Sequence, residues 1–126
     1  MATELEVSNF IGRFRTAVQL RGKAQWKSEK NRQSLLDLRQ TERSATEIII
    51  RELGPANYVN GPEPDDTEPT RDVWVFGCVV KSTETYIKIR LDEKPGKASV
   101  PLVWSFHKAQ WPLSYPLKKP TPNGGG

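Results

Sequence analysis

The stretch "YIKIRL", residues 86–91, alternates polar and apolar side chains without a break. Successive side chains of a β-strand point to opposite faces, so Tyr86, Lys88 and Arg90 share one face and the aliphatic residues between them share the other. A strand of this kind is typical of a sheet that is covered on one side only. The sequence therefore predicts a sheet whose open face carries a phenol and two cations.

Two more strands are expected on either side of this one. The segment "DVWVFGCVV", residues 72–80, is a nearly continuous run of apolar and β-branched residues, and "ASVPLVWSFH", residues 98–107, ends in the only histidine of the chain. The connecting segments "KSTET" and "DEKPGK" are short and polar. Short turns between consecutive strands predict an antiparallel meander.

The facing of the last strand follows from what must cover the sheet. If Trp104 and Phe106 join the apolar face as core residues, Ser105 and His107 stand on the open face with Tyr86. The two strands then pair so that the numbers of opposed residues add to an odd sum, for instance with Tyr86 near Ser105. A slip of one residue would invert a whole strand, so this register can be checked.

The N-terminal part is predicted to be helical. Apolar residues recur at three and four positions in "LEVSNFIGRFRTAVQL", residues 5–20, and in "ERSATEIIIREL", residues 42–53, where Thr41 is the expected N-cap. The segment "SLLDLR", residues 34–39, predicts a short helix. The polar stretch between them, residues 22–32, is expected to be a loop anchored by its tryptophan.

Helices followed by strands predict an α+β fold, in which N-terminal helices pack on one face of an antiparallel three- to four-stranded meander. A length of 126 residues fits a single domain. We expect that domain to span residues 1–119, before a flexible tail at 120–126. Its expected parts are a helical part at 1–53, a proline-rich loop at 54–70, the sheet at 71–107 and a C-terminal segment at 108–119.

Composition narrows the functional classes. The 19 Lys and Arg against 15 Asp and Glu give a net charge of +4, which permits a polyanionic partner. Cys78 is the only cysteine, lies in an apolar run and is expected to be a core residue in a cytoplasmic protein. No apolar stretch approaches the ~18 residues needed to span a bilayer. One Cys and one His do not build a usual zinc site, so we expect no metal and no cofactor.

An open face with tyrosine, lysine, arginine, serine and histidine suits a phosphodiester. Cations hold phosphates, and aromatic rings stack on exposed bases. RNA carries its own nucleophile, the 2′-hydroxyl, so cleavage needs only a base, a stabilising cation and an acid. Imidazole ordinarily titrates near neutral pH, which makes His107 the candidate general acid or base.

The remaining candidates follow from their place on or beside the same face. Lys88 and Arg90 are expected to stabilise charge on the phosphate. Tyr86 and Tyr115 are expected to position the substrate or donate a proton. The further candidates for nucleic-acid binding are Ser105, Lys108 and Lys118.

Several motifs, in order, resemble the MqsR-like toxins of type II toxin–antitoxin systems. They are "NRQSLLDL" (31–38), "EIIIREL" (47–53), "YVNGPEPDD" (58–66), "VWVFG" (73–77), "YIKIRL" (86–91) and "WSFHKAQWPLSYPLKK" (104–119). The resemblance covers most of the chain. It implies a RelE-like fold, ribonuclease activity on mRNA and a cognate antitoxin as partner, and it matches Tyr86, Lys88 and His107 to family-like motifs.

Other interpretations of the same residues stay open. A polar strand face is often simply solvated, and a single histidine at a strand end is often structural. The basic face also suits a non-enzymatic module that binds nucleic acid or protein. A third alternative is an interaction protein whose proline-rich segment, residues 54–70, docks a partner.

Overall fold

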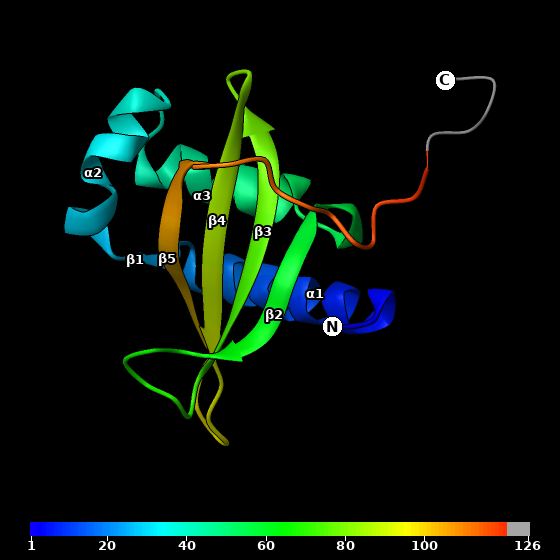
Figure 1. The fold of residues 1–126 in the computed structure, drawn as a ribbon. Helices are drawn as coiled ribbons and strands as arrows, with labels where there is room; N and C mark the ends of the chain where they lie inside the picture. Colours follow the sequence, from blue (N-terminus) through cyan, green and yellow to red (C-terminus); the bar gives the residue numbers. More distant parts are fainter. Residues whose placement is uncertain (121–126) are drawn as a thin grey trace.

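Five strands form one sheet in the computed structural model, which describes residues 1–120 (Figure 1). The strands are β1 Gln25–Trp26, β2 Tyr58–Pro64, β3 Asp72–Val80, β4 Thr83–Asp92 and β5 Val100–Lys108. Their order across the sheet is β1-β5-β4-β3-β2. The predicted meander of β3, β4 and β5 is confirmed as antiparallel. The prediction of a purely antiparallel sheet of three to four strands was wrong, because β1 pairs with β5 in parallel.

The two outer strands lie in segments that were expected to be loops. β2 occupies much of the predicted loop 54–70 and pairs with β3 through an irregular register. Its prolines are compatible with an edge strand, where one row of backbone groups needs no partner. Tyr58 anchors it, since its side chain is fully buried and its hydroxyl donates to the Gly61 carbonyl. Residues 58–64 of the expected loop are therefore part of the sheet.

The three helices are α1 Glu4–Arg21, α2 Ser28–Asp37 and α3 Glu42–Glu52, and a 3₁₀ turn, η1 Pro55–Asn57, follows α3. α1 ends at Gly22, which adopts the left-handed conformation with φ 75°. The predicted N-cap of α3 is confirmed, because the Thr41 hydroxyl accepts a hydrogen bond from the Ser44 backbone N–H at 3.0 Å. α2 begins before the predicted short helix and includes residues 28–32 of the expected loop.

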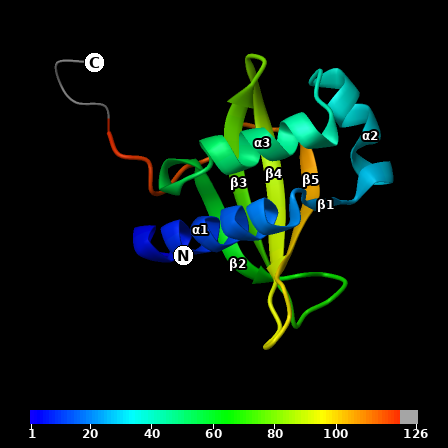
Figure 2. The same ribbon diagram turned by 180° about the vertical axis from the view of Figure 1, so that it is seen from behind.

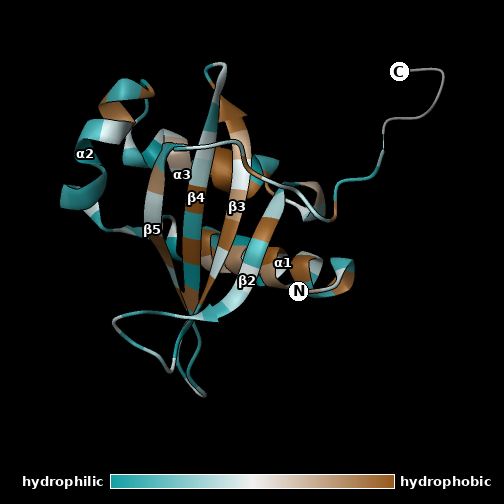
Figure 3. Cartoon of the chain, in the orientation of Figure 1, coloured by the Kyte–Doolittle hydropathy of each residue, from teal (hydrophilic) through white to brown (hydrophobic). Residues whose placement is uncertain are grey.

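α1 and α3 cover one face of the sheet, and within residues 1–120 no helix lies across the other (Figure 1 and Figure 2). Figure 2, the view from behind, shows α1 and α3 in front of the strands, whereas α2 stands beside β5. The hydropathy colours of Figure 3 show a mostly hydrophobic β3 and an alternating β4. The core lies between the helices and the covered face, and its largest buried members include Phe14, Phe76, Phe106, Ile49 and Ile87. The coarse prediction of an α+β fold with N-terminal helices on one face is confirmed.

The odd-sum register of β4 and β5 is confirmed where it matters. Tyr86 lies opposite His107, and Lys88 lies opposite Ser105. The suggested pairing of Tyr86 with Ser105 is thus displaced by two residues on the same face. Beyond Lys88 the register shifts by one residue, and the unpaired residue of that bulge is Trp104.

The bulge removes Trp104 from the core, so the prediction of a core role for this residue was wrong. Trp104 stays partly exposed, while its neighbour Phe106 is fully buried. Two lysines lie over its ring, with Lys27 Nζ 4.4 Å and Lys30 Nζ 5.6 Å from the ring centroid. An extra residue in one strand re-aims its side chain, and here it turns the indole toward cations.

The described part of the chain also bears on two other expectations. Within residues 1–120, each helix is too short or too polar to cross a bilayer. The flexible tail expected at 120–126 lies outside the described residues except for Pro120.

Candidate functional site

A pocket of about 320 Å³ opens on the face of the sheet that the helices leave uncovered. We call it the imidazole pocket. Its lining comes from α2, β4, β5 and the segment after β5, and consists of Lys30, Tyr86, Lys88, Ser105, His107, Gln110, Trp111 and Leu113. Four of the predicted site residues therefore meet in one place: Tyr86, Lys88, Ser105 and His107.

His107 is held in a defined orientation. Its ring stacks on the ring of Tyr86, its partner across the strands, with centroids 5.1 Å apart and planes 17° apart. The Nδ1 atom lies 2.8 Å from the Lys108 carbonyl oxygen. A carbonyl can only accept, so Nδ1 carries the proton of this hydrogen bond. Nε2 is therefore the atom that can take up or release a proton.

Two lysines bring positive charge to the same pocket. Lys88 stands on β4, and Lys30 reaches in from α2 and donates to the Ser105 hydroxyl oxygen at 2.7 Å. Burial lowers the pKa of the Lys30 ammonium, and the neighbouring charge of Lys88 lowers it further. Neither lysine forms an ion pair within residues 1–120. A bound anion would relieve the repulsion between these two cations.

Lys30 was missed by the sequence prediction because its segment was expected to be a loop. The neighbouring Asn31 fixes α2 to the strand: its amide donates to the Trp104 carbonyl at 3.1 Å, and its side-chain oxygen accepts from the Phe106 N–H at 2.9 Å. Ser34 adds a bond to the Phe106 carbonyl at 2.8 Å. Asn31 and Ser34 are three residues apart and share a helix face, and this spacing was the sequence signal that could have indicated a helix packed on a strand here.

The segment after β5 forms another wall of the pocket. We call residues 109–118 the C-terminal strap; it crosses the open face in front of β4 and β3 (Figure 1). Glu84 on β4 fastens it, since one carboxylate oxygen accepts from the Leu113 N–H at 3.0 Å and the other from the Tyr115 hydroxyl at 2.8 Å. The Ala109 N–H donates to the Glu84 carbonyl at 2.9 Å. The strap thus has fixed contacts with the sheet.

Arg90 does not join the pocket, although it shares the polar face of β4. Its side chain is only 7% exposed, and its guanidinium contacts Asp65 at 2.8 Å, Asp92 at 3.0 Å and Glu68 at 3.6 Å. The expected role as a phosphate ligand beside Lys88 is corrected accordingly. These carboxylates come from the β2–β3 connection and the end of β4, so Arg90 ties two connections to the sheet.

The remaining predicted contact residues also lie outside the pocket lining. Tyr115 fastens the strap, and both burial and its hydrogen bond to Glu84 raise the pKa of its hydroxyl. Lys108 contributes its carbonyl to His107, while its side chain is exposed. Lys118 is exposed at the end of the strap. The expected binding roles of Lys108 and Lys118 therefore have no support from the pocket geometry.

Two other side chains have altered acidity. Burial, and to a lesser extent the charge of Glu63, raises the pKa of Tyr86, so its hydroxyl keeps its proton near neutral pH. Burial raises the pKa of the Cys78 thiol to about 11, as suits a core residue. Among the described residues, His, Cys, Asp and Glu side chains nowhere gather in a group of three that could hold a metal ion.

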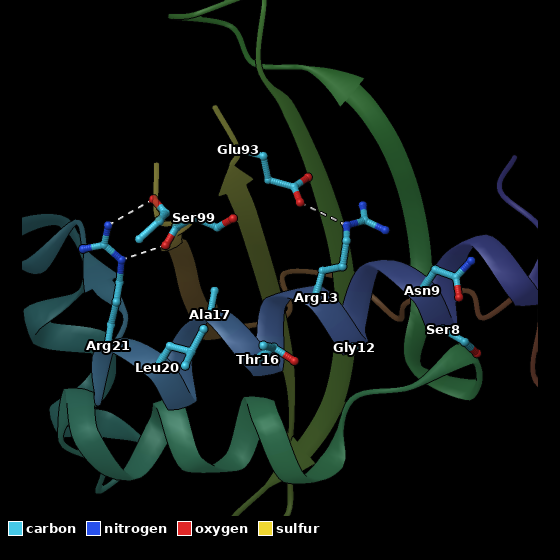
Figure 4. A pocket seen from close by; sticks show the side chains of 11 residues that line it. Ser8, Asn9, Gly12, Arg13, Thr16, Ala17, Leu20, Arg21, Glu93 and Ser99 are labelled. Carbon is cyan, nitrogen blue, oxygen red and sulfur yellow. Dashed lines mark hydrogen bonds and ion pairs between the residues drawn. The ribbon is translucent and has the colours of Figure 1, made fainter. Parts of the chain in front are cut away.

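A larger pocket of about 490 Å³ lies on the helix side, between α1 and the β4–β5 connection (Figure 4). Its two arginines are occupied by contacts within the chain. Arg13 pairs with Glu93 at 3.2 Å, and Arg21 donates to the Ser99 carbonyl at 2.7 Å. These bonds fasten α1 to the connection, and the carboxylate in the lining, Glu93, is held in the ion pair with Arg13. The imidazole pocket is the better candidate for chemistry.

Comparison of the chain with protein-family models, with curated proteins and with solved structures found no match. The resemblance to MqsR-like toxins therefore rests on the quoted motifs alone.

Proposed function

We propose that this protein is a metal-independent endoribonuclease that acts as the toxin of a type II toxin–antitoxin pair. The observation that carries the proposal is the imidazole pocket, where a histidine with an assigned Nδ1 proton stands with two lysines that have no carboxylate partner within residues 1–120. The likeness of the motifs to MqsR-like toxins supports the same class. On that reading the α+β fold is RelE-like, the substrate is mRNA and the protein works in the cytoplasm.

The side chains of the pocket suit the steps of RNA cleavage. His107 Nε2 removes the proton of a 2′-hydroxyl, and the 2′-oxygen attacks the adjacent phosphorus. Lys88 and Lys30 stabilise the negative charge that develops on the phosphate oxygens. The bond from phosphorus to the 5′-oxygen breaks, and the Tyr86 hydroxyl protonates that oxygen. The products are a 2′,3′-cyclic phosphate and a free 5′-hydroxyl, and His107 returns its proton as Tyr86 is reprotonated.

The proposed antitoxin binds the open face. The pocket lies on the face of β4 and β5 that faces away from α1 and α3, and a protein that covers it would block access to RNA. Among the described residues, Figure 1 shows no helix across this face. An acidic segment of the antitoxin would complement the two lysines.

Cleavage of a long RNA by the purified protein in EDTA tests the activity. His107→Ala and Lys88→Ala should each lower the rate by roughly 10² or more, in line with the loss of a general base or of charge stabilisation. Lys97→Ala is the matched control, because Lys97 is exposed on the β4–β5 connection away from the pocket. Full activity in the His107 and Lys88 variants would refute the assignment, and loss of activity in EDTA would refute the metal-free mechanism.

The second candidate function is a nucleic-acid-binding module without catalysis. The lysines of the pocket, which form no ion pair within residues 1–120, and its aromatic residues favour it, because they suffice for binding without any proton transfer. Binding of RNA that weakens steeply with salt, with no cleavage by the wild type, would decide for this function.

A further inference from the structure

Trp111 at the rim of the imidazole pocket has an exposed aromatic surface. It lines the pocket, yet its side chain is 69% exposed, whereas Trp74 is buried in the core. A tryptophan at such a place buries little of its own surface in the folded chain. Its indole is therefore available to a ligand that enters the pocket.

The position of Trp111 is set by the strap that carries it. The two carboxylate oxygens of Glu84 accept hydrogen bonds from Leu113 and Tyr115, which follow Trp111. The backbone carbonyl of Glu84 accepts one from the N–H of Ala109, which precedes Trp111. The strap is also in close contact with β3 at Gly77, where an added Cβ would lie 2.5 Å from the Tyr115 hydroxyl oxygen and 2.6 Å from Leu113 Cδ1. These contacts fix the chain on both sides of Trp111, next to the pocket that its side chain lines.

The groups around Trp111 indicate which ligand could offer a planar group to the indole. Lys30 and Lys88 are adjacent cations, one of them partly desolvated, and they favour a phosphate. A nucleotide offers both parts at once: a phosphate for the lysines and a planar base for the indole. In a duplex the base faces are already stacked on their neighbours, so only an unpaired base can use the indole.

We propose that Trp111 is a base-stacking residue that restricts the imidazole pocket to unpaired RNA. The proposal rests on the proposed function and adds the substrate class. One base beside the bound phosphate stacks on the indole, while the phosphate lies by Lys30 and Lys88. The strap then acts as the specificity element of the site, and Glu84 and Gly77 position it.

Binding of uncleavable RNA tests the proposal separately from catalysis. The probes are a fluorescent single-stranded oligonucleotide with 2′-O-methyl groups and the same sequence in a duplex, followed by anisotropy. Trp111→Ala should weaken single-strand binding about tenfold or more, the scale of one lost base stack, and should leave duplex binding unchanged. Trp111→Phe should restore most of the affinity. Leu20→Ala is the control, because Leu20 is 81% exposed on α1 at a distant pocket.

The outcomes separate this inference from the proposed function. Absence of both RNA binding and RNA cleavage in the wild type would refute the proposed function itself. Wild-type binding that Trp111→Ala leaves unchanged, or weakens equally for both probes, would overturn only the stacking role. Loss of affinity for a co-expressed antitoxin with unchanged affinity for RNA would make Trp111 a protein contact and would also overturn it.

Discussion

Replacement of Gly77 by alanine tests whether the C-terminal strap is a built part of the sheet. Gly77 lies in the middle of β3, and the strap passes so close that a methyl group there would meet the Tyr115 hydroxyl oxygen at 2.5 Å and Leu113 Cδ1 at 2.6 Å. Both distances are well below van der Waals contact. Either β3 or the strap must move, and the strap is the weaker partner because it has no ladder of backbone hydrogen bonds to the sheet.

The size of the effect follows from what the strap loses. If it lifts from Gly77, the bonds from the Leu113 N–H and the Tyr115 hydroxyl to Glu84 break, which costs about 1 kcal/mol each at a partly exposed site. Alanine gains about 0.5–1 kcal/mol over glycine within a strand, because the unfolded chain has less freedom to lose. We therefore expect Gly77→Ala to lower the free energy of unfolding by about 1–1.5 kcal/mol.

Urea unfolding and hydrogen exchange measure the two halves of this effect. The urea midpoint should fall, and exchange of the Leu113 N–H should become fast while the amides of β4 stay protected. Gly12→Ala is the matched control, since Gly12 lies within α1 and a Cβ there meets no atom within 4 Å. That change should raise stability by about 0.5–1 kcal/mol through helix propensity alone.

A double-mutant cycle with Tyr115→Phe tests whether the destabilisation by Gly77→Ala comes from displacement of the strap. Removal of the hydroxyl should cost about 1 kcal/mol in the wild type and much less in the Gly77→Ala background, where the hydroxyl is already displaced. Additive effects would show that Gly77 and Tyr115 are not coupled. A Gly77→Ala protein with unchanged stability and a protected Leu113 N–H would refute the reasoning as a whole.

Three further predictions concern the ion-pair cluster, the pocket and the core. Asp65→Asn should destabilise the protein by roughly 1.5–3 kcal/mol in urea unfolding, because Arg90 loses the charge of its most buried partner while Asp92 and Glu68 still contact it; an unchanged urea midpoint would contradict this. Burial alone would raise the pKa of the Asp65 carboxyl, but hydrogen bonds from Thr67 and Arg90 lower it below the value of the unfolded chain. The stability that Asp65 contributes is therefore present above about pH 4 and is lost as the pH falls through its pKa in the folded protein. Asp65→Asn should accordingly weaken the loss of stability below about pH 4. Lys30→Ala should reduce the salt slope of RNA binding by about 1, and an unchanged slope would place Lys30 away from the phosphate. Cys78 should react with a thiol reagent only after unfolding, because burial raises its pKa to about 11; fast labelling of the folded protein would contradict its place in the core.

The alternation in residues 86–91 was enough to predict the open face and the side chains on it. Side chains two apart must share a face, so it could be deduced before any coordinates that Tyr86, Lys88, Ser105 and His107 stand on one face, although Tyr86 proved to pair with His107 and not with Ser105. The bulge at Trp104 could not, because one extra residue leaves no mark on composition. Nor could β2, whose prolines and glycine are typical of a loop as much as of an edge strand.

The site itself was predicted only in its strand residues. Lys30 and Trp111 enter it from α2 and from the strap, two segments without a clear period that take their places through tertiary contacts. Asn31 fixes the first by bonding the backbone of β5, and Glu84 fixes the second. Long-range contacts of this kind follow from the folded arrangement and leave little trace in a local pattern.

Lys88 and Arg90 show why a shared face does not mean a shared role. They stand two residues apart on the same side of β4, yet Arg90 is enclosed by carboxylates while Lys88 has none within the described chain. The β2–β3 connection brings Asp65 and Glu68 to Arg90, whereas α2 brings a second cation, Lys30, near Lys88. The alternation determines which side chains face outward. Which of those charges is neutralised depends on residues distant in the sequence. The proposed anion site is therefore placed at Lys88 because its charge has no carboxylate partner within residues 1–120, and not because it belongs to a basic row.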